Sequence, residues 1–276
     1  MKTLKNYKIL WYVLLLIVLS ALSYFFLQIH RDDPISSIGE VSNTDYVDSL
    51  TPNSISTLVV PHHDLVMDKR RAVFTEAAKK TNPKTVILVS PNHFDTGSDL
   101  IQTTDRTWTL QDGKLLPDKT KISSLEKSGD AVLSDTAFNG EHGIANILDD
   151  IYSTFPNSEL VPIIIKPNAS KDSIVSLGKE LYSLCSSDCL LVASVDDSHY
   201  QSGALAELHD DLTIRALNNL DNDLIWQAEV DSNQSLALAI NWAKLNSTPK
   251  FNLFDHTNSD KLASDRDGES TSYIFG

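Results

Sequence analysis

Cysteine is nearly absent from this chain, which has only Cys185 and Cys189 among its 276 residues. A metal clip built on thiolates needs more ligands nearby than these two, and none follows in the sequence around them. Their spacing allows a local disulfide if this part of the chain lies outside a reducing compartment, and two free thiols are the other interpretation. The pair therefore bears on covalent structure rather than on metal chemistry.

Positive charge is also scarce. The chain has 23 Lys and Arg against 37 Asp and Glu, and its formal net charge is -14. The first 29 residues contain Lys2, Lys5 and Lys8 and no acid, so the whole acidic excess lies beyond them. Such a surface repels phosphate backbones, which argues against nucleic acid as a partner.

Charge of either sign is missing from residues 9–29, which are rich in Leu, Ile, Val, Tyr and Phe. At about 1.5 Å per residue, a helix of this length spans a hydrocarbon core of roughly 30 Å. Lysines before the run, and Asp32 and Asp33 after it, predict a cytoplasmic N-terminus over residues 1–8 and an extracytoplasmic domain. A cleaved signal peptide is the competing interpretation, but no small-x-small cleavage site follows. We therefore expect a single-pass membrane protein with an N-terminal transmembrane helix.

Residues 30–56 turn to Ser, Asp, Asn and Pro, which predicts a flexible tether. From residue 57 to 276, apolar runs alternate with amphipathic segments, which is typical of an α/β domain with a mainly parallel central sheet flanked by helices. The predicted strands are Thr57 to Val60, Thr85 to Val89, Leu160 to Ile165, Leu190 to Val195 and Phe251 to Phe254. The predicted helices are residues 69–80, 144–155, 173–184, 205–219 and 234–245.

One segment departs from this alternation. Residues 100–103 and 108–110 have strand character, and Gln111-Asp112-Gly113-Lys114 is a turn signal. We expect the two strands to pair with each other as an antiparallel hairpin that extends one edge of the sheet.

Histidines follow three of the predicted strands. His62 and His93 come after the first two, and His199 follows the fourth through Asp196 and Asp197. The carboxyl ends of parallel strands meet at one sheet edge, where open α/β sheets bind their ligands. Imidazole binds divalent metals and titrates near neutral pH, so these residues are candidates for a metal site. Taken singly, each histidine has a simpler explanation as a strand-end cap or a solvated side chain.

A fourth histidine, His142, adjoins Glu141 where the helix over residues 144–155 begins. Its plain interpretation is helix capping. The joint placement of several such groups after strands is what favours a functional site.

The sequence resembles the Memo family, also called AmmeMemoRadiSam system protein B. The resemblance covers about Thr57 to Asp260 and rests on four motifs in order: Pro61-His62-His63, Ser90-Pro91-Asn92-His93, Glu141-His142-Gly143-Ile144 and Ser194-Val195-Asp196-Asp197-Ser198-His199-Tyr200. It implies a fold similar to that of the class III non-haem iron extradiol dioxygenases, with a metal pocket at the strand ends.

The resemblance also implies roles for individual residues. His62 and His93 would be metal ligands, His199 with Asp196 would occupy the acid–base position, and His142 would line the same pocket. Family members commonly offer a cysteine as a further ligand, but this chain reads Asp231-Ser232-Asn233 there. Asp231 or Asn233 is then the substitute, since two histidines and a carboxylate form a facial iron triad.

The predicted anchor is a second departure, because the resemblance implies a cytoplasmic setting. Either the chain is an exported branch of the family, or the anchor has the opposite orientation.

Three functions fit these observations. The first is a domain that binds a divalent metal, iron above all, with oxidoreductase activity on a small molecule. The second is a non-catalytic interaction domain with a decayed metal site and an unknown protein partner. The third is metal-dependent hydrolysis, which needs similar ligands.

Overall fold

The structure is a computed structural model that describes residues 55–185, 188–248, 250–262 and 269–276. The predicted segments 1–8 and 9–29, and nearly all of the tether over 30–56, lie outside these residues. The proposed boundaries of the four regions therefore stay a prediction.

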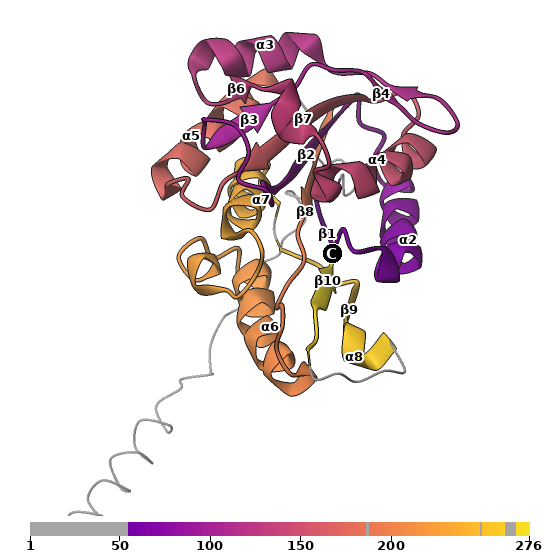
Figure 1. Ribbon diagram of the computed structural model, residues 1–276, viewed down its shortest axis with the longest axis vertical. Helices are drawn as coiled ribbons and strands as arrows, with labels where there is room; N and C mark the ends of the chain where they lie inside the picture. The colour runs from indigo at the N-terminus through magenta and orange to yellow at the C-terminus, as the bar shows by residue number, and fades with distance from the viewer. Residues whose placement is uncertain (1–54, 186–187, 249, 263–268) are drawn as a thin grey trace, which may run out of the picture. The chain divides into compact units, whose positions relative to one another are not determined.

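A six-stranded sheet forms the centre of the domain, as the apolar runs predict (Figure 1). Its strand order is β1-β8-β2-β7-β3-β6, and every neighbouring pair is parallel except β7 and β3. The strands are β1 Thr57–Val60, β8 Cys189–Ser194, β2 Thr85–Pro91, β7 Glu159–Ile165, β3 Ile101–Thr103 and β6 Val132–Leu133. The expectation of a mainly parallel sheet is confirmed.

Helices cover both faces of the sheet, which explains why its central strands are apolar without alternation. One face packs against α3 Lys119–Ser128, α5 Lys171–Leu184 and α7 Asn233–Leu245, together with the end of α6 Gly203–Asn218. The other packs against α2 Met67–Ala78, α4 His142–Thr154 and β10 Ser272–Phe275. Successive residues of one strand serve opposite layers: Val59 joins the first core, and Leu58 and Val60 join the second.

The apolar spacing and the N-terminal cap of α4 explain why these residues form a helix. Ile144, Ile147, Leu148 and Ile151 recur at helical spacing, and all four are buried on the sheet. At its N-terminus, Glu141 accepts a hydrogen bond from Gly143 N at 3.0 Å. The predicted helix therefore exists and begins two residues earlier than the apolar pattern suggested.

The predicted hairpin is wrong in its pairing. Strand β3 pairs with β7 and β6, whereas β4 Trp108–Thr109 pairs with β5 Lys114–Leu115 across the predicted turn. The turn signal was correct, but the strand run before it has a partner distant in sequence. The tertiary contact with β7 outweighs the local pairing.

The last predicted strand is displaced along the chain. Residues 251–254 are not a strand, and β9 Asp255–Asn258 pairs antiparallel with β10 in a separate two-stranded sheet. α8 Ser259–Leu262 follows β9, and short 3-10 turns occur at Asp64–Val66, Asp135–Phe138 and Ile225–Gln227.

The two cysteines form a disulfide between the end of α5 and the start of β8. Their Cα atoms are 5.8 Å apart, within the range that a disulfide requires. The structure therefore has the local disulfide and not the two free thiols.

The expected localisation as a single-pass membrane protein requires correction. No helix within the described part of the chain is both long enough and apolar enough to cross a membrane. The run over residues 9–29, on which that expectation rested, lies outside the described residues.

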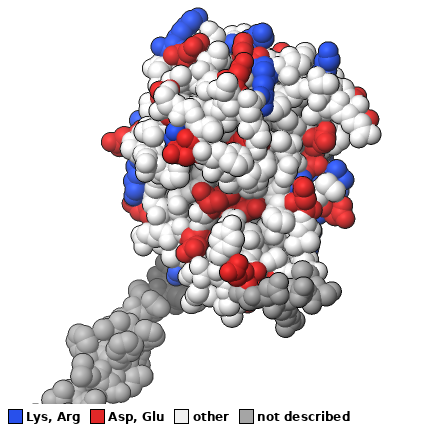
Figure 2. All heavy atoms as spheres, in the orientation of Figure 1, with Lys and Arg blue, Asp and Glu red and all other residues white. Residues whose placement is uncertain are grey.

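Acidic side chains spread across the middle and lower part of the face drawn in Figure 2, while Lys and Arg lie mainly above them and at the margins. This distribution agrees with the acidic composition of the chain.

Candidate metal centre

Three adjacent parallel strands deliver the principal polar residues of the site. Strands β1, β8 and β2 end at Val60, Ser194 and Pro91, and His62, Asp196 and His93 follow within two residues. A cavity of about 1010 Å³ opens at this edge. It is lined by His62, His63, Asp64, His93, His142, Asn146, Asp196, His199, Tyr200, Ala228, Glu229, Val230, Asp231 and Thr271.

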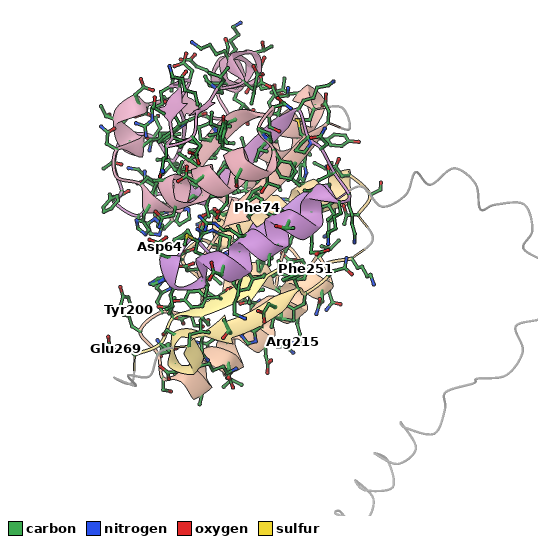
Figure 3. The ribbon with its side chains drawn as sticks, turned by 90° about the vertical axis from the view of Figure 1, so that its right-hand side faces the viewer. Asp64, Phe74, Tyr200, Arg215, Phe251 and Glu269 are labelled. Carbon is green, nitrogen blue, oxygen red and sulfur yellow. A yellow bond between two sulfur atoms is a disulfide. The ribbon has the colours of Figure 1, made fainter. Side chains whose placement is uncertain are left out.

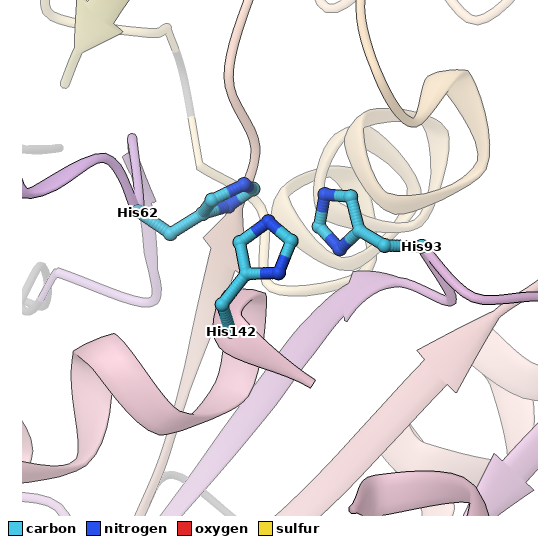
Figure 4. Close-up of side chains that lie close together, drawn as sticks. All are labelled: His62, His93 and His142. Atoms are coloured by element: carbon cyan, nitrogen blue, oxygen red, sulfur yellow. The ribbon is translucent and has the colours of Figure 1, made fainter. Parts of the chain in front are cut away.

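Three histidines converge in this cavity (Figure 4). The ring centroids of His62 and His93 are 4.9 Å apart, and those of His93 and His142 are 3.9 Å apart. One nitrogen from each of the three lies within 4.8 Å of the other two. This cluster has the composition and the spacing to bind a metal ion.

Asp231, in the loop between the turn at Ile225–Gln227 and α7, reaches the same point. Its Oδ2 atom lies 3.4 Å from His62 Nε2 and 3.6 Å from His93 Nε2. Ligand atoms bound tetrahedrally at about 2.0–2.1 Å lie about 3.3 Å apart, so these separations suit a shared ion. Asp231 Oδ1 is buried and has no hydrogen-bond partner among the described residues. Two ligand sets thus share His62 and His93, with His142 or Asp231 as the third member.

Hydrogen bonds fix the tautomers of both shared histidines. Ser194 Oγ donates to Gly143 O at 2.6 Å, so it can only accept from His62 Nδ1, 3.2 Å away. His93 Nδ1 lies 2.6 Å from Glu141 Oε1 and donates to that carboxylate. The Nε2 atoms of both rings therefore face Asp231 and are the ones available to a metal.

The electrostatics of the site centre on His93 and Glu141. Burial alone would lower the pKa of His93, but hydrogen bonds to Asp231 and Glu141, and the charges of both acids, raise it to about 9. Glu141 is fully buried, which favours its neutral form, yet its bonds to His93 and Gly143 lower its pKa. Burial and the neighbouring His93 and His62 lower the pKa of His142. The raised pKa keeps His93 protonated at neutral pH when no metal is bound.

Asp196, which the resemblance placed in an acid–base role, holds other site residues in the structure. Its Oδ1 accepts from His62 N at 2.9 Å, and its main-chain N–H donates to Asp231 Oδ2 at 3.0 Å. It is 2% exposed. Its Oδ2 also lies 3.5 Å from His62 Nε2, so Asp196 orients two candidate ligands and, like Asp231, faces the free ring nitrogen of His62.

His199 lines the cavity, next to Tyr200, which is 77% exposed. Tyr200 has a φ of 56°, a left-handed conformation that is uncommon outside glycine. Figure 3 shows Tyr200 and Asp64 on the same side of the molecule, near the start of α2. His199 is half-buried and is accessible from the cavity.

Six residues singled out from the sequence thus line one cavity: His62, His93, His142, Asp196, His199 and Asp231. Asn233, the alternative to Asp231, does not line it and donates its amide to Ile225 O and Ala228 O. Two functional residues escaped sequence reasoning. Ser194 lay inside a predicted strand, and Glu141 was interpreted only as a helix cap, although it also holds His93. Both residues belong to the motifs of the family resemblance, but neither was given a role, because both contacts join residues distant in sequence.

The comparisons with known proteins identify the family of this chain. Residues 40–274 match the family described as Memo-like protein. This chain belongs to that family. A MEMO1 family protein of Caldivirga maquilingensis is 27% identical over 200 residues, covering 70% of this chain and 68% of that protein. One of Nitrosopumilus maritimus is 22% identical over 168 residues, covering 59% and 61%.

A solved structure adds evidence on the fold alone. The uncharacterized protein JW3007 from Escherichia coli K12 superposes with a TM-score of 0.50 at 15% sequence identity. The match covers 79% of this chain and 98% of that protein. The Memo-like chain described here therefore combines a family fold with a histidine cluster able to bind a metal.

Proposed function

We propose that this Memo-like chain binds one divalent metal ion, preferentially iron, through His62 Nε2, His93 Nε2 and Asp231. The observation that carries the proposal is the position of Asp231 Oδ2, 3.4 and 3.6 Å from the two ring nitrogens. Two histidines and one carboxylate with open positions beside them are the ligand set of non-haem iron oxygenases. His142 is then a neighbour of the ion or a fourth ligand.

We further propose that the centre serves an oxidoreductase reaction on a small molecule in the cavity. Bound iron would supply redox and Lewis-acid chemistry there. His199 would exchange a proton with the bound molecule, which requires a position within hydrogen-bond reach of it. His142, whose pKa is lowered, is a neutral imidazole at neutral pH and would accept a proton or a hydrogen bond.

The buried surroundings would hold the ligands in place. Ser194 and Glu141 present the Nε2 atoms, and Asp196 orients both His62 and Asp231. This convergence counts against a non-catalytic interaction domain with a decayed site, because decay would disperse these residues.

Metal content of the purified protein tests the proposal. After anaerobic loading with Fe²⁺ and desalting, the wild type should retain about one equivalent, and the His62→Ala/His93→Ala double variant should retain none. His209→Ala is the control, because His209 does not line the cavity. Equal iron in the wild type and the double variant would refute the site.

Oxygen uptake by the iron-loaded protein tests the reaction. Uptake that depends on one of a panel of catechols and is lost in His199→Ala is the expected result. Hydrolysis of ester or phosphate substrates without any oxygen uptake would assign the centre to hydrolysis instead.

A further inference from the structure

Side chains bind every main-chain carbonyl of the segment that follows β1. This segment consists of Pro61, His62 and His63 and carries a candidate ligand. Arg70 Nη1 donates to Pro61 O at 3.3 Å and to His63 O at 3.4 Å. Asn146 Nδ2 donates to His62 O at 3.1 Å. The N–H groups of His62 and His63 bind Asp196. This short irregular segment is therefore held from both sides.

Arg70 is buried at a position where a charge is costly. It is 1% exposed, on the first turn of α2, and its Nε donates to Asp150 Oδ2 at 2.6 Å. Its Nη2 donates to Asn146 O at 2.9 Å, so it also binds α4, the helix that His142 begins. One guanidinium thus joins the His62 segment to the helix of His142.

A buried ion pair is weak evidence of a contribution to stability. The cost of removing both charges from water often equals the attraction between them, and apolar side chains of similar size stabilise as well. The fork of donors on a guanidinium is what an apolar residue or a lysine does not provide. The guanidinium of Arg70 donates to three main-chain carbonyls, which indicates that it fixes the position of the main chain.

We propose that Arg70, with Asp150 as its counter-ion and Asn146 as its partner, is the positioning residue of the metal centre. It fixes the main chain at His62, and it sets the distance from His62 to His142. The inference rests on the proposed metal binding only for its effect on affinity, since the fixed geometry of His62 is a property of the metal-free protein as well. A site of this kind requires its ligands to be held within about 0.5 Å.

The test compares Arg70→Lys with Arg71→Lys. Lysine keeps the charge opposite Asp150 in both variants. Arg71 also binds Asp150, at 2.9 Å, but its side chain is 50% exposed and it has no hydrogen bond to the His62 segment. With Co²⁺ as the probe, we expect Arg70→Lys to lose at least about tenfold in affinity and to change its visible absorption spectrum. Arg71→Lys should match the wild type in both measurements.

The ring nitrogen NMR signals of His62 in the metal-free protein provide a second measurement. We expect the wild type and Arg71→Lys to give one tautomer, protonated at Nδ1, and Arg70→Lys to give averaged or multiple signals. A folded Arg70→Lys variant with wild-type Co²⁺ affinity, spectrum and His62 signals would overturn the inference.

The two hypotheses fail in different ways. If the wild type binds no Co²⁺, the proposed function fails, and the His62 signals alone decide the role of Arg70. If Arg70→Lys does not fold, Arg70→Met replaces it, because methionine removes all the donors of Arg70 while Asp150 keeps its ion pair with Arg71. Unchanged His62 signals in that variant would overturn the inference too.

Discussion

At the scale of single residues, His93 has two acidic neighbours on opposite sides of its ring. Glu141 binds Nδ1, and Asp231 lies 3.6 Å from Nε2. The same arrangement that raises the pKa of His93 to about 9 also prepares it for a metal, because a cation at Nε2 replaces the proton there. In the metal-free protein, the proton on His93 Nε2 thus supplies the positive charge that a bound ion would supply at the same atom.

Metal affinity should therefore depend on pH. His93 is protonated below a pKa of about 9, so a metal that binds Nε2 must release this proton. We expect the apparent affinity for Co²⁺ to rise about tenfold per pH unit from pH 7 and to level off near pH 9. Competition titrations at three pH values measure this change. An affinity independent of pH would show that His93 is not a ligand.

Gly143 allows the close approach between α4 and the end of β2. A Cβ atom there would lie 2.0 Å from Ser90 Oγ and 3.2 Å from His93 Cε1, and Ser90 is fully buried. We expect Gly143→Ala to lower the free energy of unfolding by about 1–3 kcal/mol and to weaken metal binding. Urea unfolding measures the first effect.

Gly178→Ala in α5 is the matched control, because its Cβ would meet Leu238 at an ordinary 3.4 Å. This variant should be neutral or up to about 1 kcal/mol more stable, since alanine favours helix over glycine. Equal losses in the two variants would contradict the role given to Gly143.

Sequence reasoning found the residues of the site but not the contacts that orient them. His62 and His93 were predictable because each follows an apolar strand. Asp231 entered only through the missing cysteine of the family, since no local pattern singles it out. The bond from Glu141 to His93 joins residues 48 apart and depends on the packing of α4, which periodicity alone does not specify.

At the scale of elements, β8 has different tasks at its two ends. Cys189 begins the strand and is bonded to Cys185, while Ser194 ends it at the metal centre. At about 3.3 Å per residue, these ends are roughly 17 Å apart. The disulfide and the candidate metal centre therefore lie at opposite ends of the same strand.

Replacing both cysteines by serine should accordingly affect stability and leave the site unchanged. Loss of a cross-link across so short a loop should cost about 2 kcal/mol in the free energy of unfolding. Co²⁺ affinity should equal that of the wild type. A large loss of affinity in the folded variant would show that the disulfide acts on the metal centre.

The errors in predicted elements have a common cause. Residues 100–103 were paired with their neighbour in sequence, and β3 instead pairs with β7, about 60 residues away. The strand expected over 251–254 is absent there, and the polar residues Asp255, His256, Thr257 and Asn258 form β9 instead. Partners distant in sequence decide both cases, and composition does not reveal them.

At the scale of the whole molecule, stability and metal occupancy should be coupled. The raised pKa of His93 stabilises the metal-free fold fully below its ordinary value of 6.5, and this contribution is lost as pH rises through about 9. We expect the melting temperature of the chelator-treated protein to fall over that interval.

Addition of metal should restore the melting temperature, because a ligand present at 100 times its Kd raises the free energy of unfolding by about 2.7 kcal/mol. His93→Ala should abolish both the pH dependence in this interval and the response to metal. A melting temperature that is constant from pH 6.5 to 9 in the chelator-treated wild type would contradict the coupling.

The strand order has a consequence for how the chain matures. Strand β8 lies between β1 and β2 in the sheet, although it is made about a hundred residues after them. A nascent chain that has not yet reached residue 189 contains His62 and His93, but it lacks the strand that separates and aligns them. Pairing over such sequence distances is slow, so β8 enters the sheet late in folding. We therefore expect metal loading to follow synthesis of nearly the whole domain, after Asp196 and Asp231 have emerged from the ribosome.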